Sequence, residues 1–250
     1  MPTVSALYRY PVKGLSAEPL THVTLAPAET FPFDRAYAIE NGSSKFDPAA
    51  LTTLPKIAYL MLMRNARLAQ LSTEFDETSA ELTVRRGDDI VVAASLDTDE
   101  GRRTIEAFFD DFAADELRGP THVVHAPGFS FSDHSKKVVS LINMKTVDAI
   151  SREFGQTLHP LRFRGNLYVE GLAPWAEFDF VGKRIEIGGV VLEGTKRIDR
   201  CAATNVNPET AERDATIPVS LLRTYGHADC GVYLRVVEGG SIAIGDTLKA

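Results

Sequence analysis

Cysteine is scarce in this chain, where only Cys201 and Cys230 occur among 250 residues. Two cysteines in a chain of this length do not make a disulfide scaffold, and they favour a reducing, cytoplasmic location. Hydrophobic residues make up 44% of the chain. A chain of this size and composition can bury a sizeable core without disulfides, so we expect one large globular domain or two small ones.

Positive charge is also in deficit. Lys and Arg number 27 against 34 Asp and Glu, which gives a formal net charge of -7. Because nucleic acids and anionic membranes attract basic surfaces, we expect neither as a partner. No apolar run approaches the roughly 20 residues that span a bilayer, and the N-terminus lacks a signal-peptide pattern. A local pocket for one small anion stays compatible with this charge.

Several catalytic signatures are missing. The sequence contains no GxxxxGK[ST] loop, no HExxH pair and no CxxC, so it offers little support for a nucleotide or zinc site. The stretch 128–132 lacks the second glycine of a nucleophile elbow, which argues against a serine hydrolase. His122 and His125 lie in a segment that reads as extended, where they point to opposite sides, and we interpret them as structural.

The hydrophobic pattern predicts mostly strands and few helices. Helices are expected over 104–112 and 144–154, the second capped by Asn143 and ended by Gly155. Hairpins are expected around 74–79, Gly188-Gly189 and Gly239-Gly240. The expected strands are 4–10, 23–25, 36–40, 68–73, 80–84, 90–94, 137–141, 167–169, 184–187, 190–193, 231–237 and 241–244. This pattern predicts a mainly β (α+β) fold, a barrel or sandwich, with a looser boundary segment at 118–133 between residues 1–120 and 121–250.

The stretch around Cys201 carries the strongest chemical signal. Lys196, Arg197 and Arg200 precede it within six residues, and nearby positive charge favours the thiolate that ligates a soft metal or attacks. The polar run that follows indicates a loop, where functional groups are often displayed. The alternative is a half-buried loop cysteine without a role. Cys230, by contrast, begins an apolar strand and is interpreted as a small buried hydrophobic residue.

Six motifs in order resemble the MOSC (molybdenum cofactor sulfurase C-terminal) family. The central one is Arg-Cys-x-x-Thr-x-Val-Asn-Pro at 200–208. The others are Tyr-Pro-Val-Lys at 10–13, Phe-Asp-Arg at 33–35, Arg-Phe-Arg-Gly-Asn at 162–166, Leu-Arg-Thr-Tyr at 222–225, and Gly-Val-Tyr at 231–233 with 240–246. The resemblance spans nearly the whole chain and implies a β-rich N-terminal MOSC domain at 1–120 followed by an MOSC β-barrel at 121–250.

The resemblance also implies a site. It implies a pterin-type molybdenum cofactor with Cys201 as its protein sulfur ligand and catalytic residue, reduction of a small N-hydroxylated substrate, and an external electron donor protein of ferredoxin or cytochrome type. The cofactor-contacting positions that it implies are Lys13, Arg35, Arg164 and Asn166, and by weaker carry-over Asp133, Ser140 and Thr204. Forked Arg donors and Lys point charges suit a phosphate, although solvated surface is the usual fate of such cations.

The sequence departs from the family pattern at two points. Gly14 stands where relatives usually have Ser, and Asn207 stands where Asp is frequent. We expect that Thr204 and Asn207 shape the cysteine loop through side-chain to backbone bonds. We also expect neither a C-terminal ferredoxin domain nor a membrane anchor.

Two other functions stay open. One is a cofactor or sulfur carrier with a persulfide on Cys201, and the other is a binding module that has lost its cofactor. Pyridoxal phosphate is sometimes named for this family, but we identify no lysine whose sequence context supports a Schiff base with it.

Overall fold

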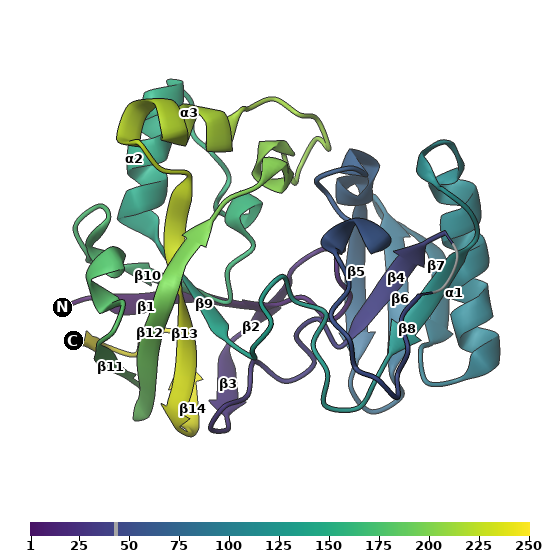
Figure 1. Ribbon diagram of the computed structural model, residues 1–250, viewed down its shortest axis with the longest axis horizontal. Helices are drawn as coiled ribbons and strands as arrows, with labels where there is room; N and C mark the ends of the chain where they lie inside the picture. The colour runs from purple at the N-terminus through teal and green to yellow at the C-terminus, as the bar shows by residue number, and fades with distance from the viewer. Residues whose placement is uncertain (43–44) are drawn as a thin grey trace.

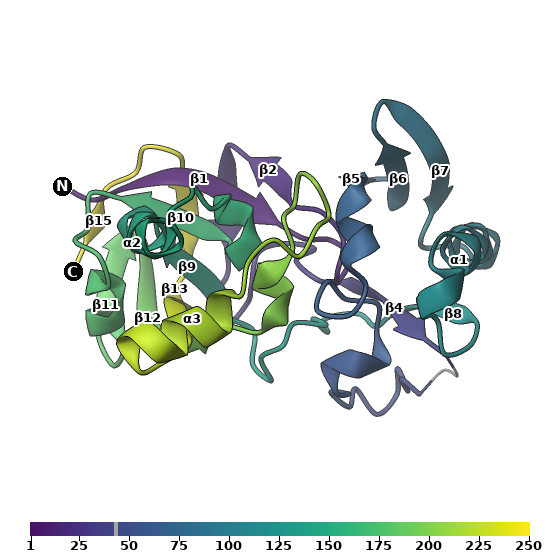
Figure 2. The same cartoon turned by 90° about the horizontal axis from the view of Figure 1, so that it is seen from above.

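The computed structural model describes residues 1–42 and 45–250 and shows a mainly β fold with short helices, as predicted. Two bodies lie side by side in both views (Figures 1 and 2). The strands are β1 (Thr3–Arg9), β2 (Glu18–Leu20), β3 (His22–Leu25), β4 (Tyr37–Asn41), β5 (Leu71–Asp76), β6 (Glu81–Arg86), β7 (Asp89–Ser95), β8 (Thr121–His125), β9 (Val139–Asn143), β10 (Leu167–Glu170), β11 (Arg184–Ile187), β12 (Val190–Asp199), β13 (Asp229–Glu238), β14 (Gly240–Ala243) and β15 (Leu248–Lys249). The α-helices are α1 (Asp99–Phe112), α2 (Met144–Phe154) and α3 (Ile217–Tyr225).

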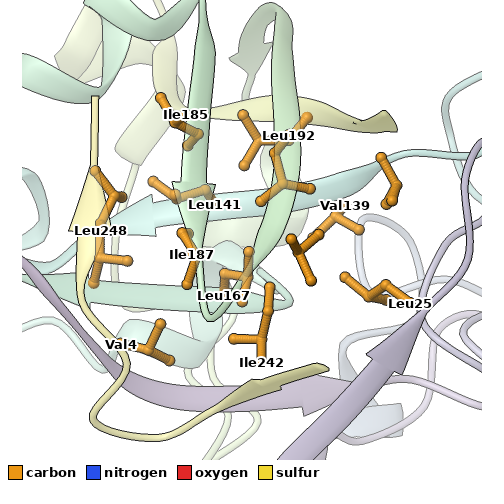
Figure 3. Close-up of a cluster of buried hydrophobic side chains, with 14 of the residues drawn as sticks. Val4, Leu25, Val139, Leu141, Leu167, Ile185, Ile187, Leu192, Ile242 and Leu248 are labelled. Carbon is orange, nitrogen blue, oxygen red and sulfur yellow. The ribbon is translucent and has the colours of Figure 1, made fainter. Parts of the chain in front are cut away.

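The larger body is built on an eight-stranded sheet of order β15-β11-β12-β13-β9-β10-β1-β2. The pairs are antiparallel except β9 with β10, which is parallel. Hydrogen bonds from Val4 N to Asp246 O (2.9 Å) and from Leu248 N to Pro2 O (2.8 Å) link β1 to the end of the chain. The curled sheet therefore encloses an apolar core, which Figure 3 shows with Val4, Leu141 and Leu192 among the converging side chains.

The smaller body contains β4 paired with β8 and the meander β5-β6-β7, with α1 beside them (Figure 1). Helix α1 buries Ile105 and Phe109 in a core shared with Leu60 and Leu82. Because β1 to β3 belong to the larger body, the chain begins there, crosses to the smaller body, and returns after β8. Both cores thus depend on segments that come before residue 42. No helix in the described chain is long and apolar enough to cross a membrane.

Four local predictions need correction. Helix α1 begins at Asp99 instead of Thr104, because the Thr98 hydroxyl caps a polar first turn by accepting a hydrogen bond from Gly101 N (3.0 Å) that apolar spacing does not reveal. Residues 66–70 form a 3-10 helix, so the strand predicted at 68–73 starts only at Leu71. Strand β12 continues beyond Glu193 to Asp199, and α3 was not predicted.

The fourth correction concerns the glycine pair at 239–240. β13 and β14 do not form a hairpin with each other, because β14 pairs with β3 in a separate two-stranded sheet. A Cβ atom at Gly239 would lie 2.6 Å from the backbone oxygen of Leu25. The glycine therefore permits the close passage of β3, a contact between distant segments that local turn rules do not reveal.

Candidate functional site

One cavity of about 320 Å³ brings together every predicted site residue. Residues of both bodies line it, including Lys56 and Met61 from the smaller one. The predicted positions in its wall are Lys13, Arg35, Asp133, Ser140, Arg164, Asn166, Cys201 and Thr204. These residues come from segments up to 191 positions apart in sequence, between Lys13 and Thr204, and the fold alone unites them.

Cys201 stands directly beyond the end of β12, at the start of the short 3-10 helix η6 (Ala202–Asn205). Thr204 folds this turn, because its backbone N (3.1 Å) and its hydroxyl (2.9 Å) both donate to Cys201 O. The predicted loop-shaping role of Thr204 is thereby confirmed. The Cys201 side chain is half-buried in the cavity wall, whereas Cys230 is fully buried and burial raises its pKa to about 12.

An ion pair between the buried Arg162 and Asp214, whose side chain is 28% exposed, anchors the cysteine loop. Arg162 donates through Nη2 to both carboxylate oxygens of Asp214 (2.6 and 2.8 Å) and through Nη1 to Asn205 O (3.2 Å). Asn207 adds a bond from Nδ2 to Asp214 Oδ2 (2.9 Å) and accepts one from the backbone N of Glu209. The predicted structural role of Asn207 is confirmed. Its amide donates here to a carboxylate, which an aspartate at this position could not do.

Arg35 and Arg164 contribute two guanidinium groups to the wall of the cavity. Both have left-handed backbones, with φ of 54° and 49°, and their guanidinium carbons lie 4.5 and 4.3 Å from the centroid of the Tyr10 ring. Arg35 is neutralised by Asp34 and also donates to Arg164 O (3.2 Å). Within residues 1–42 and 45–250, the Arg164 guanidinium has no ion pair and no hydrogen-bond acceptor. Burial lowers the pKa of Arg164, which reflects the cost of keeping this charge there.

Lys13 and Lys56 flank Asp133. Lys13, only 7% exposed, donates through Nζ to Asp133 Oδ1 (2.5 Å) and to Phe131 O (2.7 Å). Lys56 Nζ lies 3.9 Å from Asp133 Oδ2. Burial acts to lower the pKa of Lys56, but the neighbouring Cys201 and Asp133 outweigh it and the pKa is raised. Burial acts to raise the pKa of Asp133, but Lys13 outweighs it and that pKa is lowered.

Ser140 and Asn166 form a buried, hydrogen-bonded pair in the cavity wall. Asn166 Oδ1 accepts from the hydroxyl (2.7 Å) and backbone N (3.1 Å) of Ser140, and its Nδ2 donates to Tyr8 O (3.1 Å). These hydrogen bonds connect β9 to the segment before β10 and to the end of β1. The Asn166 side chain is thus engaged by Ser140 and Tyr8, and its predicted contact with a pterin stays a prediction.

Two cations near Cys201 in sequence are engaged by other groups, although Arg200 also lines the cavity. Arg200 donates to Phe163 O (2.7 Å) and to Cys230 O, and Arg197 lies with its guanidinium carbon 4.3 Å from the Phe178 ring centroid. Lys56, from the other body, lines the same cavity as Cys201, and the thiol is among the groups that raise the pKa of Lys56. No motif around Lys56 marks it in the sequence, so only the tertiary fold identifies it.

The cavity carries an excess of positive charge in an acidic protein. Seven Lys and Arg side chains line it against three Asp side chains, although the chain as a whole has a net charge of -7. Such a pocket attracts a small anion such as a phosphate. No group of three or more His, Cys, Asp or Glu side chains suited to a metal ion gathers in the part of the chain that the structure describes.

Comparisons with known proteins place this geometry in a family. The MOSC N-terminal beta barrel domain matches residues 1–116, and the MOSC domain matches residues 126–249. A molybdenum cofactor sulfurase from Caenorhabditis briggsae is 24% identical over 254 residues, which cover 94% of this chain and 34% of that protein. The chain thus spans about a third of the length of this curated relative.

Solved structures offer weaker likenesses. The YUAD protein from Bacillus subtilis has a TM-score of 0.48 and 12% identity, covering 99% of this chain and 94% of its own. YiiM from Geobacillus stearothermophilus has a TM-score of 0.35 and 17% identity, covering 44% of this chain and 52% of its own. At these TM-scores the likenesses carry no weight for function. The two matched domains together extend over nearly the whole sequence, and the chain belongs to the MOSC family.

Proposed function

We propose that this chain binds a pterin-type molybdenum cofactor in the cavity, with Cys201 as protein sulfur ligand, and reduces small N-hydroxylated compounds. The proposal depends on one observation: the partly exposed sulfur of Cys201 lines the same cation-rich cavity as Lys13, Arg35 and Arg164. The family and the curated sulfurase relative add support for a molybdenum cofactor. We propose that the electrons come from a separate ferredoxin- or cytochrome-type protein.

The residues present fit such a cofactor. Arg164 is a half-buried cation without a counter-ion in the described chain, and a terminal phosphate would neutralise it. Arg35 and Lys13 stand beside it, and Cys201 offers the soft thiolate that suits molybdenum. When bound, the cofactor supplies two-electron redox chemistry at the metal.

Lys56 is suited to deliver a proton. Reduction of an N–OH bond consumes two electrons and two protons, and it yields an N–H bond and water. Lys56 Nζ keeps a proton at the Cys201 side of the cavity, where its pKa is raised, and Asp133 Oδ2 holds that ammonium within 3.9 Å. We propose that Lys56 Nζ donates to the departing hydroxyl oxygen and recovers its proton from solvent, since the side chain is 35% exposed.

Replacing Cys201 tests the proposal. We expect the protein from cells competent for cofactor synthesis to hold molybdenum stoichiometrically and to reduce a hydroxamic acid with a reduced artificial dye. Cys201→Ser should lose at least about 90% of turnover with an unchanged circular dichroism spectrum. Cys230→Ser, at the buried second cysteine, is the control and should keep both metal and turnover. Full turnover in Cys201→Ser with molybdenum bound would contradict the proposed role.

A second candidate function is sulfur transfer, which the sulfurase relative favours. Here the half-buried Cys201 would carry a persulfide, and Lys56 would stabilise its terminal sulfur anion. Intact-mass spectra of metal-free protein distinguish the two. A dithiothreitol-sensitive persulfide that disappears in Cys201→Ser supports transfer, whereas stoichiometric molybdenum with dye-driven turnover supports the reductase.

A further inference from the structure

A second cavity adjoins the first one. Its volume is about 340 Å³, and it shares the wall residues Gly14, Leu62, Arg162, Arg164 and Ala203 with the cysteine cavity. Because five residues border both spaces, the two cavities are neighbours, and Arg164, which has no ion-pair partner among the described residues, lies at their common border. A molecule with two chemically different ends that lies across this border places one end in each space.

The lining of this second cavity is mainly apolar, with Ser16, Gln70 and Ser72 as uncharged polar side chains. Leu15, Leu68, Leu71, Leu161 and Val206 contribute side chains, and the pocket lies between the two bodies. No carboxylate of the described residues lines it. One of its two guanidinium groups, Arg162, is already neutralised by Asp214. A cationic group would therefore find no counter-charge here, whereas an uncharged ring or short aliphatic chain would gain from burial.

We infer that this apolar cavity is the specificity pocket that receives the uncharged body of the substrate, while the oxygen-bearing head passes Arg164 toward Cys201. The inference rests on the proposed function and adds the substrate class: N-hydroxylated compounds with an uncharged aromatic or aliphatic body, not cationic ones. Small side chains at the wall, Ala17 and Ala69, leave room for the body.

A set of three probes tests the inference by direct binding. Benzohydroxamic acid carries a ring and an N-hydroxy head, acetohydroxamic acid replaces the ring by a methyl group, and 4-(aminomethyl)benzohydroxamic acid carries the same head on a cationic body. Calorimetry on wild-type protein of measured molybdenum content should give benzohydroxamic acid an affinity at least about tenfold above that of acetohydroxamic acid, since the ring buries more apolar surface. The cationic 4-(aminomethyl) analogue should bind at least about tenfold more weakly than benzohydroxamic acid, because its ammonium group meets no carboxylate of the described residues in the second cavity.

Substitutions that fill the second cavity test whether it is the site that binds the ring. Ala69→Phe and Ala17→Phe narrow it from two different walls, and each should remove the ring preference while leaving acetohydroxamic acid binding within about twofold. Ala93→Phe, on an exposed strand position outside both cavities, is the matched control and should keep the preference. Thermal melts confirm that each variant is folded. A ring preference that persists in a folded Ala69→Phe or Ala17→Phe protein, or no ring preference in the wild type, overturns the inference.

The two proposals fail separately. If hydroxamic acids are not turned over but the ring preference disappears on filling, the pocket assignment stands and the proposed reductase function falls. If turnover occurs with equal affinity for both hydroxamic acids, the function stands and the pocket assignment falls.

Discussion

At the scale of single residues, Lys56 is the cation from the smaller body that shares the cavity with Cys201. It reaches Cys201 from the other body, while Arg197 and Arg200 are engaged elsewhere. We expect Lys56→Gln to slow alkylation of Cys201 by iodoacetamide at pH 7 by roughly threefold to fivefold, because a partly exposed cation stabilises a thiolate modestly. Mass spectrometry follows the reaction, and the buried Cys230 should stay unmodified. Lys183→Gln, at an exposed site outside the cavity, should react like wild type, and an equal rate in Lys56→Gln would remove Lys56 from the site.

Gly14 stands where the family resemblance implies Ser, and its backbone leaves no room for a side chain. Its φ is 86°, and a Cβ atom there would lie 2.6 Å from the backbone oxygen of Leu60. Gly14→Ser should therefore lower the free energy of unfolding by about 2 kcal/mol instead of adding a hydroxyl contact to the site. Gly155→Ala, also left-handed but with open space around the position, should cost only about 1 kcal/mol. Urea unfolding measures both, and similar losses in the two variants would rule out the close contact as the cause.

At the scale of elements, the Arg162–Asp214 pair ties the cysteine loop to the segment before β10. Burial acts to raise the pKa of Asp214, but the hydrogen bonds from Arg162 and Asn207 outweigh it, so the pKa is lowered. On acidification the unfolded chain takes up this proton first, near pH 4. The stability from Asp214 is thus present above that pH and is lost as the pH falls through the lower folded-state pKa.

Asp214→Asn should remove this acid-dependent part of the stability. The variant is expected to be less stable than wild type at pH 6, by about 3 kcal/mol, because Arg162 is left as a buried, unpaired cation. The gap should narrow between pH 4 and pH 2.5, as wild type loses the same ion pair. Urea midpoints across this range measure it. The control Asp88→Asn, at an exposed turn, should show the same pH dependence of the urea midpoint as wild type. A stability difference between Asp214→Asn and wild type that stays constant with pH would contradict the role assigned to Asp214.

The predictability of each element follows from how local its cause is. Helix α2 begins and ends where the sequence indicated, because the Asn143 cap and the left-handed Gly155 are local signals. Strand β11 likewise has its predicted bounds. The pairing of β14 with β3 and the arrival of Lys56 beside Cys201 both depend on contacts across more than 140 residues, which no local pattern encodes. The family motifs indicated the remaining site residues because they carry that long-range information from relatives.

At the scale of the whole molecule, the path of the chain couples the two bodies. Residues 3–25 supply β1 to β3 to the larger body before the chain builds the smaller one, and Arg213 from the larger body donates to Leu62 O and Met63 O (both 2.9 Å) in the smaller one. Neither body can therefore separate without loss of shared contacts at the cavity. We expect urea to unfold both in one cooperative transition.

Tryptophan fluorescence can test this coupling, because Trp175 is the only tryptophan and packs against the core of the larger body. Phe108→Trp in a Trp175→Phe background moves the reporter to the smaller body, where residue 108 packs against the second core. After correction for the stability of each variant by circular dichroism, both reporters should give midpoints that agree with the loss of secondary structure. A smaller-body midpoint well apart from the circular dichroism midpoint would mean that the bodies unfold independently. In that case the cavity could open while each core stays folded.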